Sequence, residues 1–317
     1  MTVVIDLHCD SLEAHVEGRR DIARRSNAGH LDLPRLVEAG VTAQVFAIWT
    51  DPRRYRPGAR APFVSRTIAA FDRLCAGPGP LVPARRPADV RPRPGRVAGI
   101  LAVEGGHALD GSLASLARFH RRGVRILTLT WNNSNELARS CLAIDGNRRG
   151  LTRLGRLAVA RMNHLGMVVD LSHAGDRTFA DALDASTAPV ICSHSGCRAR
   201  HDFPRNLSDD QLRALGRQGG VVGIVFLPYF LTRARRRATI DDVIDHVCHA
   251  AAVAGSAAVG LGSDFDGFRD PPPRGLEDVT CLPALADGLR RRGFSAGEVA
   301  GILGGNFLRV WRAVAGA

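Results

Sequence analysis

The sequence contains no lysine, and all 43 of its lysine-or-arginine positions hold arginine. A barrel enzyme that works through a Schiff base needs a lysine amine, and so does a two-metal hydrolase whose ions are bridged by a carbamylated lysine. Both chemistries are excluded. The seven cysteines are an odd number without a Cys-x-x-Cys pair, which argues against a disulfide framework and against a zinc site of four thiolates.

Long apolar runs are also missing. No window approaches the roughly eighteen uninterrupted apolar residues of a membrane-spanning helix, so no membrane partner is expected. The chain opens directly into Val-Val-Ile-Asp-Leu-His at residues 3–8, without the basic region, apolar stretch or small-residue cleavage site of a secretory signal. These features predict an unexported, cytoplasmic protein.

Aromatic residues make up only 5% of the chain, while its net charge is +12. The charge raises the question of a nucleic-acid partner. The arginines are scattered, often as doublets such as Arg19–Arg20 and Arg121–Arg122, and two tyrosines and three tryptophans cannot supply a stacking platform between them. We therefore expect a solvated, arginine-rich surface and no nucleic-acid partner.

Short runs rich in β-branched residues recur along the chain, each followed by a polar loop and a stretch with helical periodicity. Continuous apolar character is typical of parallel strands buried on both faces. Eight such units predict an α/β protein with a single TIM-like (β/α)8 barrel domain over residues 1–317. The predicted strands lie near Val3–Ile5, Val41–Phe46, Val97–Val103, Val124–Leu129, Met167–Asp170, Val190–Cys192, Val221–Val225 and Val259–Leu261.

Capping and helix-breaking residues predict several boundaries. Apolar residues spaced three and four apart over Leu151–Met162 indicate a helix that ends at Gly166. Ser208–Gln211 reads as a capping box that opens another helix. The proline-rich segment Pro78–Pro94 is expected to be a long surface connection, and Asp270–Pro273 an irregular loop.

Metal-ligand residue types cluster just past the predicted strands, where barrels of this kind carry their functional side chains. A lone His-x-Asp pair or a lone glutamate at a strand end is a weak signal, because solvated or capping roles are commoner. Two histidines at consecutive strand ends, on the same rim as that pair and that glutamate, are hard to attribute to chance. The residues concerned are His8, Asp10, Glu104, His173, His194 and Asp264.

Three histidines and two carboxylates suit zinc, which accepts both nitrogen and oxygen ligands. Five ligands exceed what one tetrahedral zinc uses, so two Zn²⁺ ions that share a carboxylate are the simplest arrangement. Glu104 has two oxygens and can bridge the ions, together with a hydroxide, at a separation of roughly 3.5–4 Å. Asp264 is then placed to accept a proton from the attacking water and to protonate the leaving amine.

Eight short motifs run in order along nearly the whole chain: Asp6–Asp10, Val103–His107, Leu127–Thr130, Val169–His173, Ser193–Ser195, Pro204–Asn206, Asp264–Gly267 and Gly305–Val310. Together they resemble the membrane (renal) dipeptidase family, which has the metallo-dependent hydrolase barrel of the amidohydrolase superfamily. The resemblance implies that His8 and Asp10 bind one zinc, that Glu104 bridges, and that His173 and His194 bind the second zinc.

The same resemblance implies that Asp264 is the proton shuttle. It also implies that Arg205 holds the C-terminal carboxylate of the substrate, a role suited to the forked donors of a guanidinium. The implied activity is zinc-dependent hydrolysis of small L-Xaa-Xaa dipeptides, with a D residue tolerated at the C-terminal position.

One position departs from the family pattern. Some members carry a histidine directly after the Leu-Thr-Leu-Thr run, where it contacts the tetrahedral intermediate, and this chain has Trp131 there. Asn132, Asn133 or Asn135 could donate instead, so Trp131 and Asn132 are candidate substrate-binding residues. His107 either orients a metal ligand or makes a loop hydrogen bond.

Two other functions remain open on the sequence alone. The chain could be another amidohydrolase, acting on a cyclic amide, a lactam or a peptide-like pathway intermediate with a free carboxylate. A non-catalytic barrel with a degenerate site is a third class, but it would be favoured only if a ligand or Asp264 were missing, and none is. A homodimer is compatible with each enzymatic reading.

Overall fold

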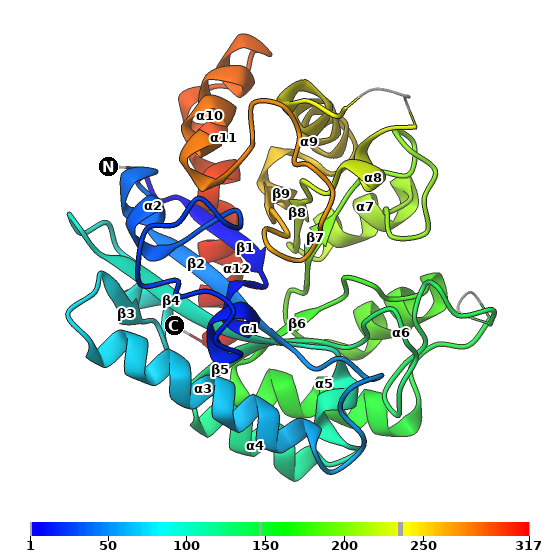
Figure 1. Ribbon diagram of the computed structural model, residues 1–317. Helices are drawn as coiled ribbons and strands as arrows, with labels where there is room; N and C mark the ends of the chain where they lie inside the picture. Colours follow the sequence, from blue (N-terminus) through cyan, green and yellow to red (C-terminus); the bar gives the residue numbers. More distant parts are fainter. Residues whose placement is uncertain (1, 146–147, 234–236, 317) are drawn as a thin grey trace.

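The computed structural model describes residues 2–145, 148–233 and 237–316 (Figure 1). The strands are β1 Ile5–Cys9, β2 Ala43–Trp49, β3 Leu81–Pro83, β4 Val97–Glu104, β5 Val124–Thr128, β6 Val168–Asp170, β7 Ile191–Ser195, β8 Val221–Ile224 and β9 Val259–Leu261. The α-helices are α1 Ser11–Val16, α2 Leu33–Glu38, α3 Arg60–Ala76, α4 Leu113–Arg121, α5 Arg153–Leu165, α6 Asp176–Ala185, α7 Asp209–Arg217, α8 Pro228–Leu231, α9 Ile240–Ala254, α10 Leu282–Arg291, α11 Ala296–Ala300 and α12 Asn306–Ala315. Shorter 3-10 or π-helical turns are η1 Pro87–Asp89, η2 Gly106–Leu109, η3 Ser256–Ala258, η4 Val279–Cys281 and η5 Gly301–Gly305.

Eight of these strands close into a parallel barrel. The order around the sheet is β2-β1-β9-β8-β7-β6-β5-β4, and β4 then pairs with β2 from Ala43 opposite Ala98 to Trp49 opposite Glu104. The predicted (β/α)8 barrel is confirmed. Because the strands are parallel, all of their carboxyl ends lie at one rim, and the loops that follow them meet there.

The predicted strands all exist, but several continue further toward the rim. β1, β2 and β7 extend past the predicted ends, so His8 and His194 lie inside strands rather than after them. The prediction for Pro78–Pro94 is wrong in part, since this segment contains β3 and η1. β3 pairs with the first residues of β4 at the edge of the sheet, a position in which proline costs no hydrogen bond.

The helix and loop predictions are otherwise confirmed. α5 ends at Gly166, which takes the left-handed conformation with φ of 68°. Ser208 caps α7, and its side chain and that of Gln211 make the reciprocal hydrogen bonds of a capping box. Asp270–Pro273 has no regular secondary structure.

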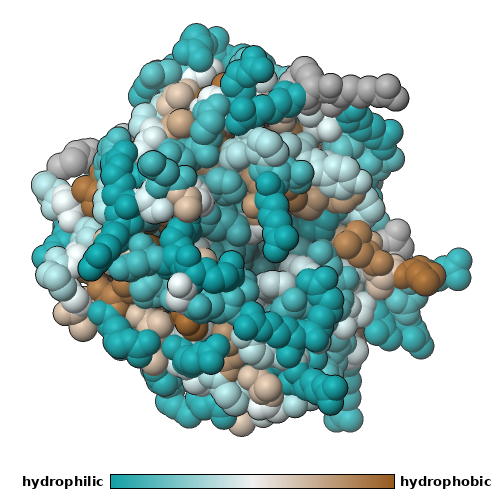
Figure 2. Space-filling model, viewed as in Figure 1, coloured by the Kyte–Doolittle hydropathy of each residue, from teal (hydrophilic) through white to brown (hydrophobic). Residues whose placement is uncertain are grey.

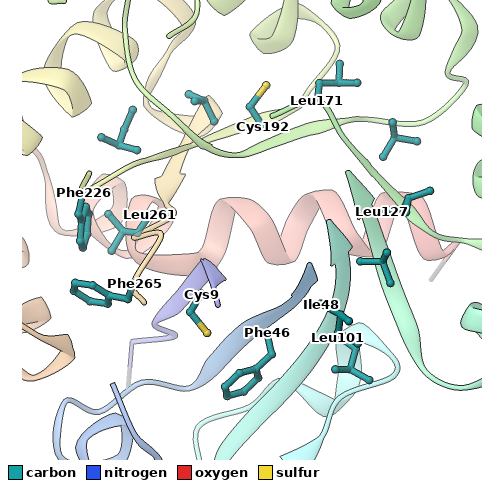
Figure 3. Packing of buried hydrophobic residues seen from close by; sticks show 14 of the residues in the cluster. Cys9, Phe46, Ile48, Leu101, Leu127, Leu171, Cys192, Phe226, Leu261 and Phe265 are labelled. Carbon is teal, nitrogen blue, oxygen red and sulfur yellow. The ribbon is translucent and has the colours of Figure 1, made fainter. Parts of the chain in front are cut away.

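Two apolar layers support the barrel. Its interior is filled by strand residues that include Leu7, Val45 and Ile100, and this layer packs against Phe307 and Trp311 of α12. The other layer lies between the strands and the surrounding helices, and Figure 3 shows its side chains pointing outward from the ring of strands. The rim is therefore built on a core that is packed on both sides of the sheet.

The face of the molecule drawn in Figure 2 is mainly hydrophilic. Figure 2 shows polar and charged residues covering most of one face, which is hollowed near its centre. Within the described ranges, no helix is both long enough and apolar enough to cross a bilayer.

Candidate metal centre

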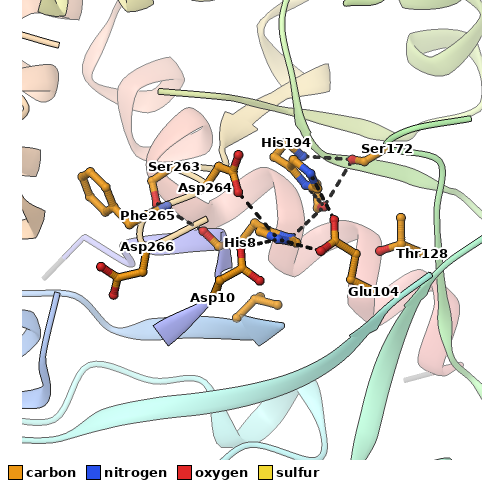
Figure 4. Close-up of polar contacts among 12 residues, drawn as sticks. His8, Asp10, Glu104, Thr128, Ser172, His194, Ser263, Asp264, Phe265 and Asp266 are labelled. Atoms are coloured by element: carbon orange, nitrogen blue, oxygen red, sulfur yellow. Dashed lines mark hydrogen bonds and ion pairs between the residues drawn. The ribbon is translucent and has the colours of Figure 1, made fainter. Parts of the chain in front are cut away.

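The metal-site candidates chosen from the sequence converge at the carboxyl rim of the barrel (Figure 4). They come from the ends of, or the loops after, β1, β4, β6, β7 and β9, which places residues far apart in the sequence around one point. All except the partly exposed Asp10 are buried. The set comprises His8, Asp10, Glu104, His173, His194 and Asp264.

Glu104 lies between two groups of these side chains. Its Oε2 is 3.8 Å from Nε2 of His8, and that nitrogen is 3.6 Å from Oδ2 of Asp10. Its Oε1 is 2.9 Å from Nε2 of His173 and 3.4 Å from Nε2 of His194, and these two nitrogens are 3.1 Å apart. Each carboxylate oxygen of Glu104 therefore faces its own set of potential ligands.

Hydrogen bonds on the far side of the imidazole rings orient the two histidines. Oδ1 of Asn132 lies 2.9 Å from Nδ1 of His173, and Oγ of Ser193 lies 2.8 Å from Nδ1 of His194. The Ser193 hydroxyl donates to Asp170 at 2.7 Å, so its oxygen accepts the proton of His194 Nδ1. Both rings then carry their proton on Nδ1 and present the Nε2 lone pair toward Glu104.

Asp170 ties three neighbouring strands together beneath this site. Its carboxylate accepts hydrogen bonds from the hydroxyl of Thr128 at the end of β5 at 2.7 Å, and from the backbone N–H groups of Ser172 and Ser193 at 3.0 and 2.8 Å. A buried carboxylate with this many donors is fully satisfied and holds β5, β6 and β7 in fixed register. This register positions the rings of His173, which follows β6, and of His194, which lies within β7.

Among the three histidines of the site, His8 is the one whose pKa is raised. Burial lowers its pKa, but the negative charges of Glu104, Asp10 and Asp264 outweigh burial and raise the pKa to about 10. Its Nε2 is buried and, within the described part of the chain, makes no hydrogen bond. A buried ring nitrogen that faces several carboxylates and makes no hydrogen bond is well placed to act as a ligand of a metal cation.

The other groups respond mainly to burial. Burial raises the pKa of Glu104 to about 8 and that of Asp264 to about 7, against the opposing charge of His8 and with a further increase from Asp10. Burial lowers the pKa of His173 and His194 well below the usual value. Neutral imidazoles beside crowded carboxylates make a donor set that binds a divalent cation well.

A tight loop aims Asp264 at the same point. Asp264 has φ of 60°, a left-handed conformation that is uncommon for non-glycine residues and is adopted by aspartate more often than by most. Its backbone N–H donates to the carbonyl of His8 at 3.1 Å, and the N–H of Asp10 donates to the carbonyl of Phe265 at 2.9 Å. Oδ1 of Asp264 lies 3.9 Å from Nε2 of His8 as a result.

The site opens into a cavity of about 910 Å³. Arg205 lines it, is only 3% exposed, and donates to the carbonyl of His194 at 3.2 Å while its guanidinium lies 5.3 Å from the ring of Phe230. Among residues 2–145, 148–233 and 237–316, no carboxylate forms an ion pair with Arg205. A buried guanidinium with spare donors on a cavity wall is suited to an anionic ligand.

The sequence profile of the membrane dipeptidase family, peptidase family M19, matches residues 1–317. The chain belongs to this family. This member of the membrane dipeptidase family is 44% identical over 219 residues to a protein of Schizosaccharomyces pombe named as an uncharacterized dipeptidase, and the match covers 68% of this chain and 53% of that protein. The chain thus spans about half the length of that relative.

Solved structures of the same family share its fold over the whole chain. A metallopeptidase named dipeptidase AC, of family M19, superimposes with a TM-score of 0.91 at 30% identity and covers 100% of this chain and 99% of its own. A metallopeptidase from Rhodobacter sphaeroides, bound to a phosphinate mimic of the dipeptide L-Ala-D-Ala, gives a TM-score of 0.89 at 28% identity, with 99% and 100% covered.

The residues after the Leu-Thr-Leu-Thr run include the two candidate substrate-binding residues, Trp131 and Asn132. Trp131 lines the cavity, with its ring 4.7 Å from that of Trp49. Asn132 also lines it, but its side chain contacts His173, a link that the sequence did not suggest. Asn135 is engaged within its own loop. His107 lies beside a different loop, with its Nε2 2.7 Å from the carbonyl of Thr50, which follows β2.

Several residues that line or support the site were not predicted from the sequence. Trp49, Leu227 and Phe230 line the cavity, and Ser193 and Asp170 orient the histidines. Trp49 ends β2 and Asp170 ends β6, so the rule that functional residues follow strand ends could have found both. No comparable local signal marks Leu227 or Phe230.

Gly267 offers a test of how tightly the site is built. A Cβ at this position would collide with Oδ1 of Asp264 and Oδ2 of Asp10. We expect Gly267→Ala to displace both carboxylates and to weaken binding of divalent metal about tenfold or more, measured by competition with a chromophoric chelator. Gly297→Ala is the matched control, since a Cβ there meets no atom within 4 Å. Equal metal affinity in the two variants would contradict this geometry.

Proposed function

We propose that this chain is a zinc-dependent dipeptidase that hydrolyses the peptide bond of L-Xaa-Xaa dipeptides and tolerates a D residue at the C-terminal position. The observation that carries the proposal is the position of Glu104, with one carboxylate oxygen facing His8 and the other facing two further histidines. Family membership supports the activity. The Rhodobacter sphaeroides relative, which holds a mimic of L-Ala-D-Ala, supports tolerance of the D residue.

Two zinc sites account for this donor set. His8, Asp10 and Oε2 of Glu104 would hold one ion, and His173, His194 and Oε1 of Glu104 the other. Two nitrogens that each lie about 2.0–2.1 Å from one zinc ion are about 3.3 Å apart at a tetrahedral angle, and the Nε2 atoms of His173 and His194 are 3.1 Å apart. When bound, such ions lower the pKa of a water molecule and polarise the scissile carbonyl.

Asp264 is proposed as the group that moves the proton. Its carboxylate projects into the cavity beside His8, and burial raises its pKa to about 7. A group that titrates near neutral pH can both take and give a proton. Asp264 takes a proton from the attacking water and gives it to the leaving amine nitrogen as the C–N bond breaks.

Arg205 is proposed to anchor the substrate. Its buried guanidinium can bind the C-terminal carboxylate with two parallel hydrogen bonds. Leu227 and Phe230 line the cavity on the same side and offer apolar surface to the side chain of the C-terminal residue. This anchor sets the direction of the substrate across the barrel.

Metal removal tests the activity itself. The purified protein should hydrolyse L-Ala-L-Ala, lose that activity when a chelator strips its metal, and recover it on addition of zinc. The reason is that, in this proposal, the attacking water is activated by the bound metal. Release of alanine and metal content would be followed in the same samples. Full activity in metal-free protein would contradict the proposal.

Replacement of Asp264 separates proton transfer from metal binding. We expect Asp264→Asn to retain bound metal and fold while kcat for L-Ala-L-Ala falls by about 100-fold to 10,000-fold. Asp51→Asn is the control, because Asp51 lines the same cavity but pairs with Arg53. If the Asp264 variant kept the wild-type kcat, the proton-transfer role would be wrong.

Replacement of Arg205 tests the carboxylate anchor. Arg205→Met should lower kcat/KM for L-Ala-L-Ala by about 10-fold to 100-fold, mainly through KM, since a charged hydrogen-bonding pair is lost. The same variant should cause little further loss with L-Ala-L-Ala-amide, which has no carboxylate to bind. Equal losses on both substrates would count against the assignment.

A further inference from the structure

The anchor at Arg205 and the loop after β2 lie on opposite sides of the barrel. Around the closed ring, β7 and β2 are separated by four steps in either direction. Arg205 follows β7 and the residues from 50 onward follow β2. A peptide held at Arg205, with its scissile carbonyl over Glu104, therefore extends its amino-terminal residue toward the loops after β2 and its neighbour β1.

Several charged side chains line the cavity on that side, and we call four of them the Glu17 cluster: Glu13, Glu17, Arg19 and Arg54. Glu17 accepts hydrogen bonds from Nε of Arg19 at 2.8 Å and from Arg54. Arg19 also lies 3.3 Å from Glu13. Glu17 belongs to the segment after β1 and Arg54 to the loop after β2, so their ion pair joins two loops at the cavity edge.

Burial of Glu17 and local contacts of Arg54 hold the Glu17 cluster in place. The side chain of Glu17 is only 10% exposed although it lies at the rim. Arg54 sits in a turn in which the N–H of Tyr55 donates to the carbonyl of Asp51 at 2.8 Å, and its guanidinium lies 5.4 Å from the Tyr55 ring. The same cavity is lined by Glu104 and His194. The Glu17 cluster is therefore a wall of the reaction cavity and not a remote surface feature.

We propose that the ion pair between Glu17 and Arg54 limits the length of the substrate on its amino-terminal side. This inference rests on the proposed dipeptidase function. The Arg205 anchor restricts only the carboxyl side, because a tripeptide can also present its C-terminal carboxylate there. Each further residue extends a chain by up to about 3.3–3.6 Å, and a third residue would run into the wall at the Glu17–Arg54 pair.

The test compares hydrolysis of L-Ala-L-Ala with hydrolysis of the last peptide bond of L-Ala-L-Ala-L-Ala, in which water adds and one alanine is released. Arg54→Ala and Glu17→Ala should each raise the tripeptide-to-dipeptide ratio of kcat/KM by about tenfold. Ion pairs with an exposed partner contribute little to stability, so both variants should fold, which thermal unfolding would check.

Two further variants make the test specific. Arg53→Ala is the matched control, because Arg53 lines the same cavity but its ion pair with Asp51 stays within one turn; it should leave the ratio unchanged. Arg54→Lys keeps a cation within reach of Glu17 and should retain most of the discrimination. A ratio that does not change in Arg54→Ala, or that changes as much in Arg53→Ala, overturns the inference.

The two proposals fail in different ways. A wild-type protein that hydrolyses L-Ala-L-Ala but cleaves the tripeptide equally well overturns the length limit and leaves the dipeptidase function standing. A wild-type protein, loaded with zinc, that hydrolyses neither peptide overturns the dipeptidase function, and the length limit falls with it.

Discussion

The site depends on one buried carboxylate that faces in two directions. Glu104 ends β4 with Oε2 toward His8 and Oε1 toward His173 and His194. A carboxylate so enclosed is costly to keep charged, as its raised pKa shows. Positive charge on both sides would offset that cost, which is the physical reason why we assign this residue the bridging role. The other candidate ligands complete the two sets around it.

The barrel makes this arrangement possible by bringing short segments from distant parts of the chain to one rim. Each strand contributes one or two side chains, and the loops that follow are held by buried polar contacts such as those of Asp170 with Ser193 and Thr128. The apolar layers inside and outside the sheet, closed by α12, keep the strand ends in register. A site made from many strands needs this rigidity, because small displacements of ligands weaken metal binding and catalysis.

Much of the fold and the site could be predicted because the relevant signals are local. Apolar runs mark the strands, and polar residues such as Asp10 and Glu104 near their ends mark the rim. Contacts that depend on packing between distant segments left no such signal. The sequence suggested Asn132 only as a candidate substrate-binding residue and gave no sign of its contact with His173. β3 was hidden in a proline-rich stretch because an edge strand tolerates proline. The pairing of Glu17 with Arg54 likewise depends on how two loops meet.

Anomalous diffraction from zinc-loaded crystals tests the central claim most directly, because it locates each ion without reference to activity. The account predicts two separate zinc peaks on either side of the Glu104 carboxylate, one beside His8 and Asp10 and one between His173 and His194. A single peak, or peaks that do not share Glu104 as a ligand, would contradict it.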